Sequence, residues 1–184
     1  PYTTLFRSIN TEEETGKIIQ MALTHHMTIY SYHTCMDRAS HLSMNKWLME
    51  AIHIEDYQNY GEDGLIKTAK LDTTLKQLIK QVKQDLKLSA VRYVGNIDQS
   101  IKSIAVIGGS GADFIDELSD QVDVLITGDI KYHEAQNALN KGLCLIDIGH
   151  FAERVMVPQV RKILEEKFDV TVYESQQEDY FKFG

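Results

Sequence analysis

The feature that most constrains the fold is a series of three short apolar runs in the second half of the chain, separated by segments with helical spacing. The runs cover residues 104–107, 122–126 and 143–146, and Asp123 is their one polar member. A strand that is apolar on both faces is buried on both faces, and strands that alternate with helices pair in parallel. The pattern therefore predicts an α/β fold with a mainly parallel sheet flanked by helices.

Other local signals predict the remaining elements. Segments rich in β-branched and aromatic residues predict further strands at residues 27–32, 65–71, 90–94 and 169–173. Thr11 and Glu14 have the spacing of a capping box, and Ser43 precedes another helical pattern, so each is a predicted helix start. Pro158 stands inside the last helical pattern, where the helix is expected to restart or kink.

Composition and charge limit the class of protein. The 184 residues, 43% of them hydrophobic, are enough for a sizeable core. A formal net charge of −8 argues against a nucleic-acid partner, and no apolar run approaches the length of a membrane span. Cys35 and Cys144 match no zinc or redox spacing and fit a reducing compartment. The predicted location is the cytoplasm.

Glycine and polar residues follow the predicted strands. The strand ends of the second half are Gly108-Gly109-Ser110-Gly111, Thr127-Gly128-Asp129 and Gly149-His150. The carboxyl ends of parallel strands form the ligand crevice of an open α/β sheet. Glycine lets the backbone approach a ligand closely, and helix starts offer N–H groups to anions. The glycine loop is either a phosphate cradle or simply a tight strand-to-helix turn.

Two histidine–carboxylate pairs are candidate metal ligands. His150 and Glu153 lie three residues apart at a predicted helix start, so both side chains can reach one cation. The alternative is a solvated pair or a helix-terminal hydrogen bond. His33 and Asp37 lie four residues apart after the strand predicted at 27–32. Here the alternative is that Asp37 caps the next turn and His33 bonds the backbone.

A third cluster surrounds the predicted helix start after residues 122–126. Asp129, Lys131 and His133 lie within five residues there. The cluster is either part of a site or an N-cap aspartate with a solvated lysine.

Four motifs occur together, in order: His33-Thr34-x-x-Asp37, Gly108-Gly109-Ser110-Gly111, Thr127-Gly128-Asp129-Ile130-Lys131-Tyr132-His133 and Gly149-His150-x-x-Glu153. In this combination the chain resembles the GTP cyclohydrolase I type 2 homologue family, also called the dinuclear metal-centre or interacting-factor-three-like family. The resemblance covers about residues 9–170. It implies two similar α/β lobes facing a site for two divalent metal ions, zinc, iron or manganese, and ring-shaped, commonly hexameric, homo-oligomers.

The resemblance also implies roles for individual residues. Asp37, His150 and Glu153 fall on metal-ligand positions, and His33 falls on a position adjoining the metals, as a proton relay or an alternative ligand. For the cluster of Asp129, Lys131 and His133 the resemblance implies a place near the site and no particular role. The candidate substrate-side residues are Gly109, Ser110, Gly111, Asp129 and His133.

The start of the chain departs from the family pattern. Family members carry a metal-binding histidine doublet just before a segment like Leu5-Phe6-Arg7, and here Pro1 and Tyr2 stand at that place. We therefore expect an N-terminally truncated first lobe and incomplete binding of the metals. The expected divisions are a non-native or disordered start at 1–8, the rest of the first lobe at 9–55, a connecting strand–helix–strand segment at 56–100, a second lobe at 101–175 and a tail at 176–184.

The function implied by the resemblance is a metal-dependent hydrolase of a nucleotide-like small molecule, with GTP ring opening as the named activity. Two interpretations of a different class stay open. One is a metal-binding oligomeric scaffold, or a partner-binding protein, without turnover. The other is a nucleotide-binding α/β domain that uses the loop at residues 108–111 without metal.

Overall fold

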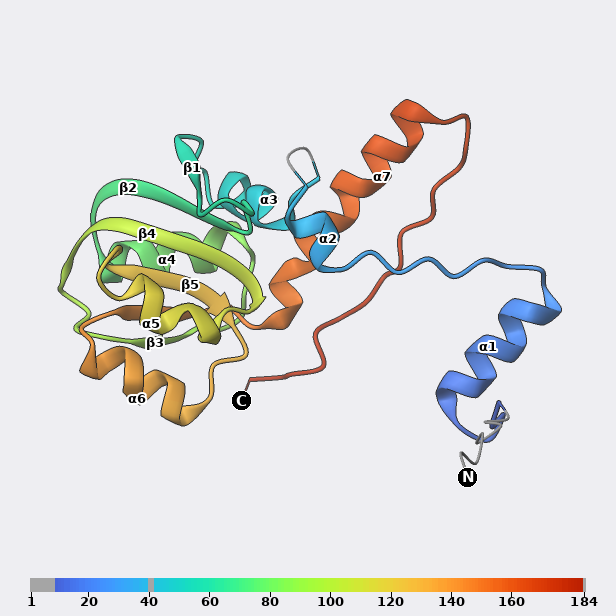
Figure 1. Cartoon of the computed structure of the whole chain (residues 1–184), viewed down its shortest axis with the longest axis horizontal. Helices are drawn as coiled ribbons and strands as arrows, with labels where there is room; N and C mark the ends of the chain where they lie inside the picture. Colours follow the sequence, from blue (N-terminus) through green and yellow to red (C-terminus); the bar gives the residue numbers. More distant parts are fainter. Residues whose placement is uncertain (1–8, 40–41, 184) are drawn as a thin grey trace, which may run out of the picture. The chain divides into compact units, whose positions relative to one another are not determined.

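The structure is a computed structural model that describes residues 9–39 and 42–183. These residues belong to two compact units, one ending at His33 and the other beginning at Thr34. The first unit contains helix α1 (Glu14–Thr24), drawn in blue in Figure 1. The other helices and the strands that the structure describes lie in the second unit. The start predicted at residues 1–8 falls outside the described residues.

The second unit is built on a six-stranded sheet with the order β1-β2-β4-β5-β6-β3. Strands β4, β5 and β6 pair in parallel, and β2, β1 and β3 join them in antiparallel pairs. The strands are β1 (Tyr57–Tyr60), β2 (Ile66–Thr74), β3 (Arg92–Val94), β4 (Ser100–Ser110), β5 (Val124–Gly128) and β6 (Cys144–Asp147). The sheet is thus mixed, with a parallel centre.

Helices cover both faces of this sheet (Figure 1). One face carries α3 (Met44–Ala51), α4 (Leu75–Asp85), the 3-10 helix η2 (His150–Val155) and α7 (Met156–Lys167). The other carries the 3-10 helix η1 (Ala112–Phe114), α5 (Ile115–Leu118) and α6 (Tyr132–Asn140). A further short helix, α2 (Thr34–Asp37), begins the unit.

The two faces form separate cores because successive residues of a strand point to opposite sides. On β4, Ile104 and Val106 pack with α3 and α4, whereas Ala105 and Ile107 pack with α5 and α6. All of β5 is buried. The burial of both faces is what the apolar runs of the second half predict, and it confirms the α/β fold.

Two of the four additional strands are confirmed. Residues 65–71 correspond to β2 and residues 90–94 to β3. The predictions at 27–32 and 169–173 are wrong, because the structure gives both segments no strand. A β-rich composition produces a strand only where another strand offers its backbone groups, and in the described part of the chain neither segment is paired.

The predicted helix starts have mixed outcomes. Ser43 caps α3 by accepting a hydrogen bond from the Lys46 N–H at 3.3 Å. The prediction of a capping box at Thr11 is wrong. The Asn10 side chain accepts a hydrogen bond from the Glu12 N–H at 3.1 Å, and α1 begins at Glu14. Asparagine competes for nearby backbone donors and delays the helix. The last helix restarts at Met156, which places Pro158 in its first turn, where proline is tolerated.

The predicted division into lobes stays a prediction. The segments at 56–100 and 101–175 contribute strands to the same sheet. Among the helices that the structure describes, none has the length and apolar composition needed to cross a bilayer.

The end of α4 allows a stability test of the fold. Asp85 is the last residue of α4, where the helix dipole disfavours a negative charge. Its Oδ2 atom is buried without a hydrogen-bond partner among the described residues, and its Oδ1 atom lies 3.9 Å from His53 Nε2. We expect Asp85→Asn to raise the free energy of unfolding by about 0.5–1 kcal/mol in urea titrations. Asp72→Asn, at an exposed position of β2, is the charge-matched control, and a loss of stability in Asp85→Asn alone would contradict the expectation.

Candidate metal site at the carboxyl edge of the sheet

Parallel pairing of β4, β5 and β6 brings three loops to one edge of the sheet. Ser110 pairs with Gly128, and Thr127 pairs with Asp147, so these strands end side by side. The Gly111 N–H donates to Thr127 Oγ1 at 2.8 Å and ties the first loop to the second. The loops predicted to meet at the carboxyl edge therefore do so.

Close backbone packing at Gly128 sets the spacing of these loops. A Cβ atom at residue 128 would lie 2.8 Å from the Gly109 carbonyl oxygen and 2.9 Å from the Gly149 carbonyl carbon. Real Cβ atoms do not approach backbone so closely, so only glycine allows this packing. At Gly109 a Cβ atom would lie 2.7 Å from Glu153 Oε1 and 3.9 Å from His150 Cε1.

The His150 imidazole stands between two carboxylates. Its Nδ1 lies 2.8 Å from Asp129 Oδ2, a hydrogen-bond distance, and its Nε2 lies 3.6 Å from Glu153 Oε2. Asp129 has φ +55°, a left-handed conformation that aspartate tolerates better than most residues. The loop after β5 therefore turns its carboxylate onto the ring presented by the loop after β6.

These carboxylates change the proton affinity of the ring. The hydrogen bond to Asp129 raises the pKa of His150 above its ordinary value of 6.5; burial opposes the rise, and the negative charges of Glu153 and Asp129 add to it. The His150 side chain is two-thirds exposed, so solvent screens these interactions. The ring is a favourable place for positive charge, whether a proton or a bound cation.

The geometry on the Nε2 side suits two ligands of one cation. Two ligand atoms about 2.0–2.2 Å from a tetrahedral zinc ion lie about 3.3–3.6 Å apart. The 3.6 Å between His150 Nε2 and Glu153 Oε2 falls within this range and is too long for a hydrogen bond. Metal-binding histidines almost always donate their other ring N–H to a carboxylate, a backbone carbonyl or a water molecule, and Asp129 is placed to be that acceptor.

The described residues supply only part of a metal centre. Across residues 9–39 and 42–183, no three His, Cys, Asp or Glu side chains gather closely enough to hold an ion. His150 and Glu153 come together as expected from their spacing. Asp37 ends α2 in the second unit, and His33 is the last residue of the first unit. The ligand role of Asp37 and the relay role of His33 stay predictions.

The predicted substrate-side residues lie in different surroundings. The Glu153 carboxylate approaches Gly109, and the Gly111 N–H is already bonded to Thr127, so neither position offers a ready donor to a phosphate. His133 is exposed on α6 and packs edge-on against Tyr132, with ring centroids 5.7 Å apart. The binding roles of Gly109, Ser110, Gly111 and His133 stay predictions, and Asp129 adjoins the His150 ring.

Sequence reasoning missed a buried carboxylate beside the site. Asp147 ends β6, and its side chain, 6% exposed, pairs with Arg92 of β3. It also accepts from the Gly149 N–H at 3.0 Å and, more weakly, from the Ile130 N–H at 3.4 Å. A charged residue at the end of an apolar strand is the signal that could have revealed it, because buried carboxylates need partners.

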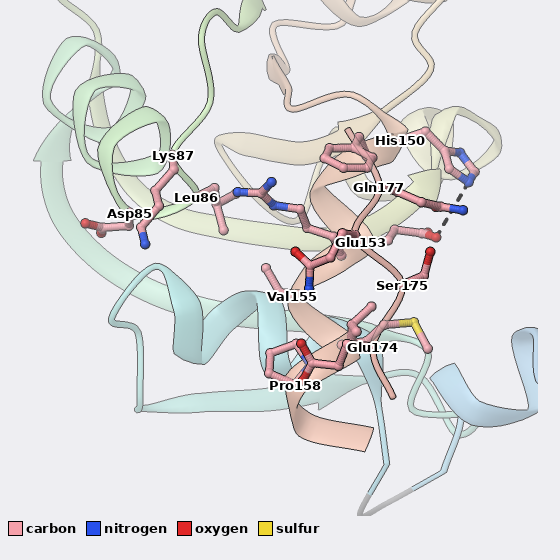
Figure 2. Close-up of a pocket in the computed structure, with 15 residues that line it drawn as sticks. Asp85, Leu86, Lys87, His150, Glu153, Val155, Pro158, Glu174, Ser175 and Gln177 are labelled. Carbon is pink, nitrogen blue, oxygen red and sulfur yellow. Dashed lines mark ion pairs between the residues drawn. The ribbon is translucent and has the colours of Figure 1, made fainter. Parts of the chain in front are cut away.

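A cavity of about 530 Å³ opens beside His150 and Glu153 (Figure 2). Its walls come from the end of α4, from η2 and the start of α7, and from the C-terminal segment at 174–177. In Figure 2, Ser175 and Gln177 lie next to the His150–Glu153 pair. The charged residues of the wall are three acids and two bases besides His150: Asp85, Glu153, Glu174, Lys87 and Arg154.

Comparison with known sequences identifies relatives of this chain. The family Duf34/NIF3 (NGG1p interacting factor 3) matches residues 3–180. Proteins named GTP cyclohydrolase 1 type 2 homolog are 37% identical over 123 residues in Staphylococcus aureus and 32% identical over 145 residues in Clostridium acetobutylicum. These matches cover 66% and 74% of this chain but only 33% and 54% of the relatives.

Solved structures share the fold. A Bacillus cereus protein related to NIF3 has a TM-score of 0.87 at 23% identity, covering 98% of this chain and 80% of that one. A hypothetical protein of Staphylococcus aureus has a TM-score of 0.85 at 26% identity, covering 96% and 75%. The sheet and its helices thus have counterparts in these proteins.

The packing at Gly128 is open to a direct test. Gly128→Ala forces the backbone of two loops apart and is expected to lower the free energy of unfolding by about 1–3 kcal/mol. It should also shift the NMR signals of the His150 ring. Gly142→Ala is the control, since its φ of +76° makes alanine costly but open space surrounds it. Unmoved His150 signals in Gly128→Ala would show that this packing does not set the site.

The charge of His150 gives a pH prediction for the metal-free protein. Asp129→Asn is expected to lower the pKa of His150 toward 6.5, as measured by NMR titration. Because the pKa of His150 is higher in the folded than in the unfolded chain, protonation of His150 stabilises the fold. This contribution to the free energy of unfolding is fully present below pH 6.5 and is lost as the pH rises through the pKa of the folded protein. The stability difference between wild type and Asp129→Asn should therefore shrink at alkaline pH. Asp98→Asn, an exposed charge-matched control, should leave the pKa of His150 unchanged.

Proposed function

Because the chain belongs to the Duf34/NIF3 family, we propose that it contributes His150 and Glu153 to a divalent metal centre of a metal-dependent hydrolase. The observation that carries this proposal is the His150 ring, with Nδ1 on Asp129 at 2.8 Å and Nε2 at 3.6 Å from Glu153. Asp37 is proposed as a further ligand. The full centre is proposed to hold two ions, zinc, iron or manganese, and to be incompletely bound by this chain.

The residues of the chain have separate proposed tasks. His150 binds through Nε2, while Asp129 keeps the remaining ring proton on Nδ1 and fixes the orientation of the ring. Glu153 supplies a carboxylate oxygen, and His33 is proposed to relay a proton. A bound divalent cation would lower the pKa of a coordinated water and polarise the atom under attack.

The proposed substrate is a nucleotide-like small molecule. The relatives are named GTP cyclohydrolase 1 type 2 homologs, and a cavity of about 530 Å³ is of the size that small-molecule sites have. Arg154 and Lys87 can attract phosphate, but Asp85, Glu153 and Glu174 repel it. The cavity is acidic on balance, so phosphate binding would depend on bound cations.

Assembly and location complete the proposal. We propose a homo-oligomeric ring, such as a hexamer, by analogy with the family. The molar mass measured by light scattering tests this assembly. The cytoplasm is proposed because Cys35 and Cys144 are both free thiols. The alternative function is a metal-binding scaffold or partner-binding protein without turnover.

Manganese binding tests the metal proposal on this chain. Paramagnetic Mn²⁺ is expected to broaden the NMR signals of His150 and Glu153 first, even if it binds weakly. Glu153→Gln should weaken this binding at least about 10-fold, because loss of a residue that merely orients a metal ligand already costs that much. Glu166→Gln, an exposed glutamate on α7, is the matched control.

Each result leads to a different conclusion. Broadening that centres on other carboxylates, or that persists in His150→Ala, would overturn the metal assignment. GTP turnover in the presence of Mn²⁺, Zn²⁺ or Fe²⁺ that disappears in Glu153→Gln supports the hydrolase. Metal binding at His150 without turnover favours the scaffold.

A further inference from the structure

Asp147 is the most deeply buried charged group next to the proposed site. Its side chain is 6% exposed, and a carboxylate so buried is costly unless hydrogen bonds and an opposite charge compensate it. Arg92 supplies the charge, and backbone N–H groups supply the bonds. Since Arg92 itself is 70% exposed, the pair connects the core to the surface.

The partners of Asp147 belong to the two loops that carry the His150–Asp129 contact. Asp147 Oδ1 accepts from the N–H of Gly149, the residue before His150. Its Oδ2 faces the N–H of Ile130, the residue after Asp129, at 3.4 Å. One carboxylate thus contacts the chain immediately beside both residues of the hydrogen bond.

Arg92 strengthens the same connection from a third strand. Its Nη2 donates to Asp147 and, at 2.8 Å, to the Ile130 carbonyl oxygen. Arg92 and Asp147 are paired residues of the antiparallel strands β3 and β6. The sheet therefore fixes the backbone of Arg92, from which the guanidinium extends to the loop after β5. Both the N–H and the C=O of Ile130 are held, which restrains the left-handed backbone of Asp129.

We propose that Asp147 and Arg92 are positioning residues that hold the loop after β5 against the loop after β6, so that Asp129 orients the His150 ring and directs Nε2 toward Glu153. The proposal about ring orientation stands on the contacts alone. Its consequence for metal binding rests on the proposed function.

Histidine NMR on the metal-free protein tests the orientation. A neutral imidazole carries one N–H, and with Asp129 as acceptor the proton belongs on Nδ1. The ¹⁵N shifts of His150, assigned by comparison with His150→Asn, are expected to show the Nδ1–H form in wild type at a pH where the ring is neutral. Arg92→Gln and Asp147→Asn should each convert it to a mixture of both forms.

Matched controls separate positioning from stability. Asp116 and Lys141 form a surface ion pair, with 3.5 Å between Oδ1 and Nζ, that shares no residue with this network. Asp116→Asn and Lys141→Gln should therefore leave the His150 spectrum unchanged. Urea unfolding of every variant reports the structural cost. If Asp147→Asn does not fold, Arg92→Gln decides; the Arg92 side chain is 70% exposed, and urea unfolding reports the cost of leaving Asp147 without its cation.

Manganese binding then distinguishes the two proposals. Arg92→Gln is expected to weaken Mn²⁺ binding about 10-fold or more, as for other residues that orient a ligand. If the variants change the His150 tautomer but the wild-type protein binds no Mn²⁺, the proposed function is wrong and the positioning role stands. The positioning role is overturned if wild type shows the Nε2–H form, or if the tautomer is the same in wild type, Arg92→Gln and a folded Asp147→Asn.

Discussion

The parallel pairing of β4, β5 and β6 is the constraint on which the rest of the unit depends. Strands that run the same way end at the same edge, so three loops from distant parts of the sequence meet there. Gly128 lets their backbones come closer than any side chain would allow. The site is therefore a consequence of backbone packing first and of side-chain chemistry second.

Acidic side chains come together at this edge of the sheet. Asp129, Asp147 and Glu153 converge there, in a chain whose formal net charge is already −8. Arg92 compensates the buried acid, while the more exposed acids face His150 from both sides. Such an arrangement favours a cation at the ring and disfavours an unaccompanied phosphate.

Local sequence predicted elements well where the fold buries them and poorly where it does not. The central strands were recognisable because burial on both faces requires continuous apolar runs. Residues 27–32 and 169–173 have a similar β-rich composition but remain unpaired in the described part of the chain. At Asn10 a single side-chain hydrogen bond moved the start of α1 beyond the predicted cap. For the two unpaired segments the deciding factor was a partner strand elsewhere in the chain, whereas at Asn10 it was a local hydrogen bond next to the predicted cap.

The sequence alone determined the α/β class and the proximity of His150 to Glu153, because apolar periodicity and helical spacing are local properties. It also placed the strand-end loops at one edge, because strands predicted to be parallel end together. Only the tertiary structure decided that Asp129 binds the other ring nitrogen and that Asp147 and Arg92 join the two loops. Those contacts connect residues 21 and 55 positions apart. Their distances depend on strand register and on the space at Gly128, which no spacing in a single sequence specifies.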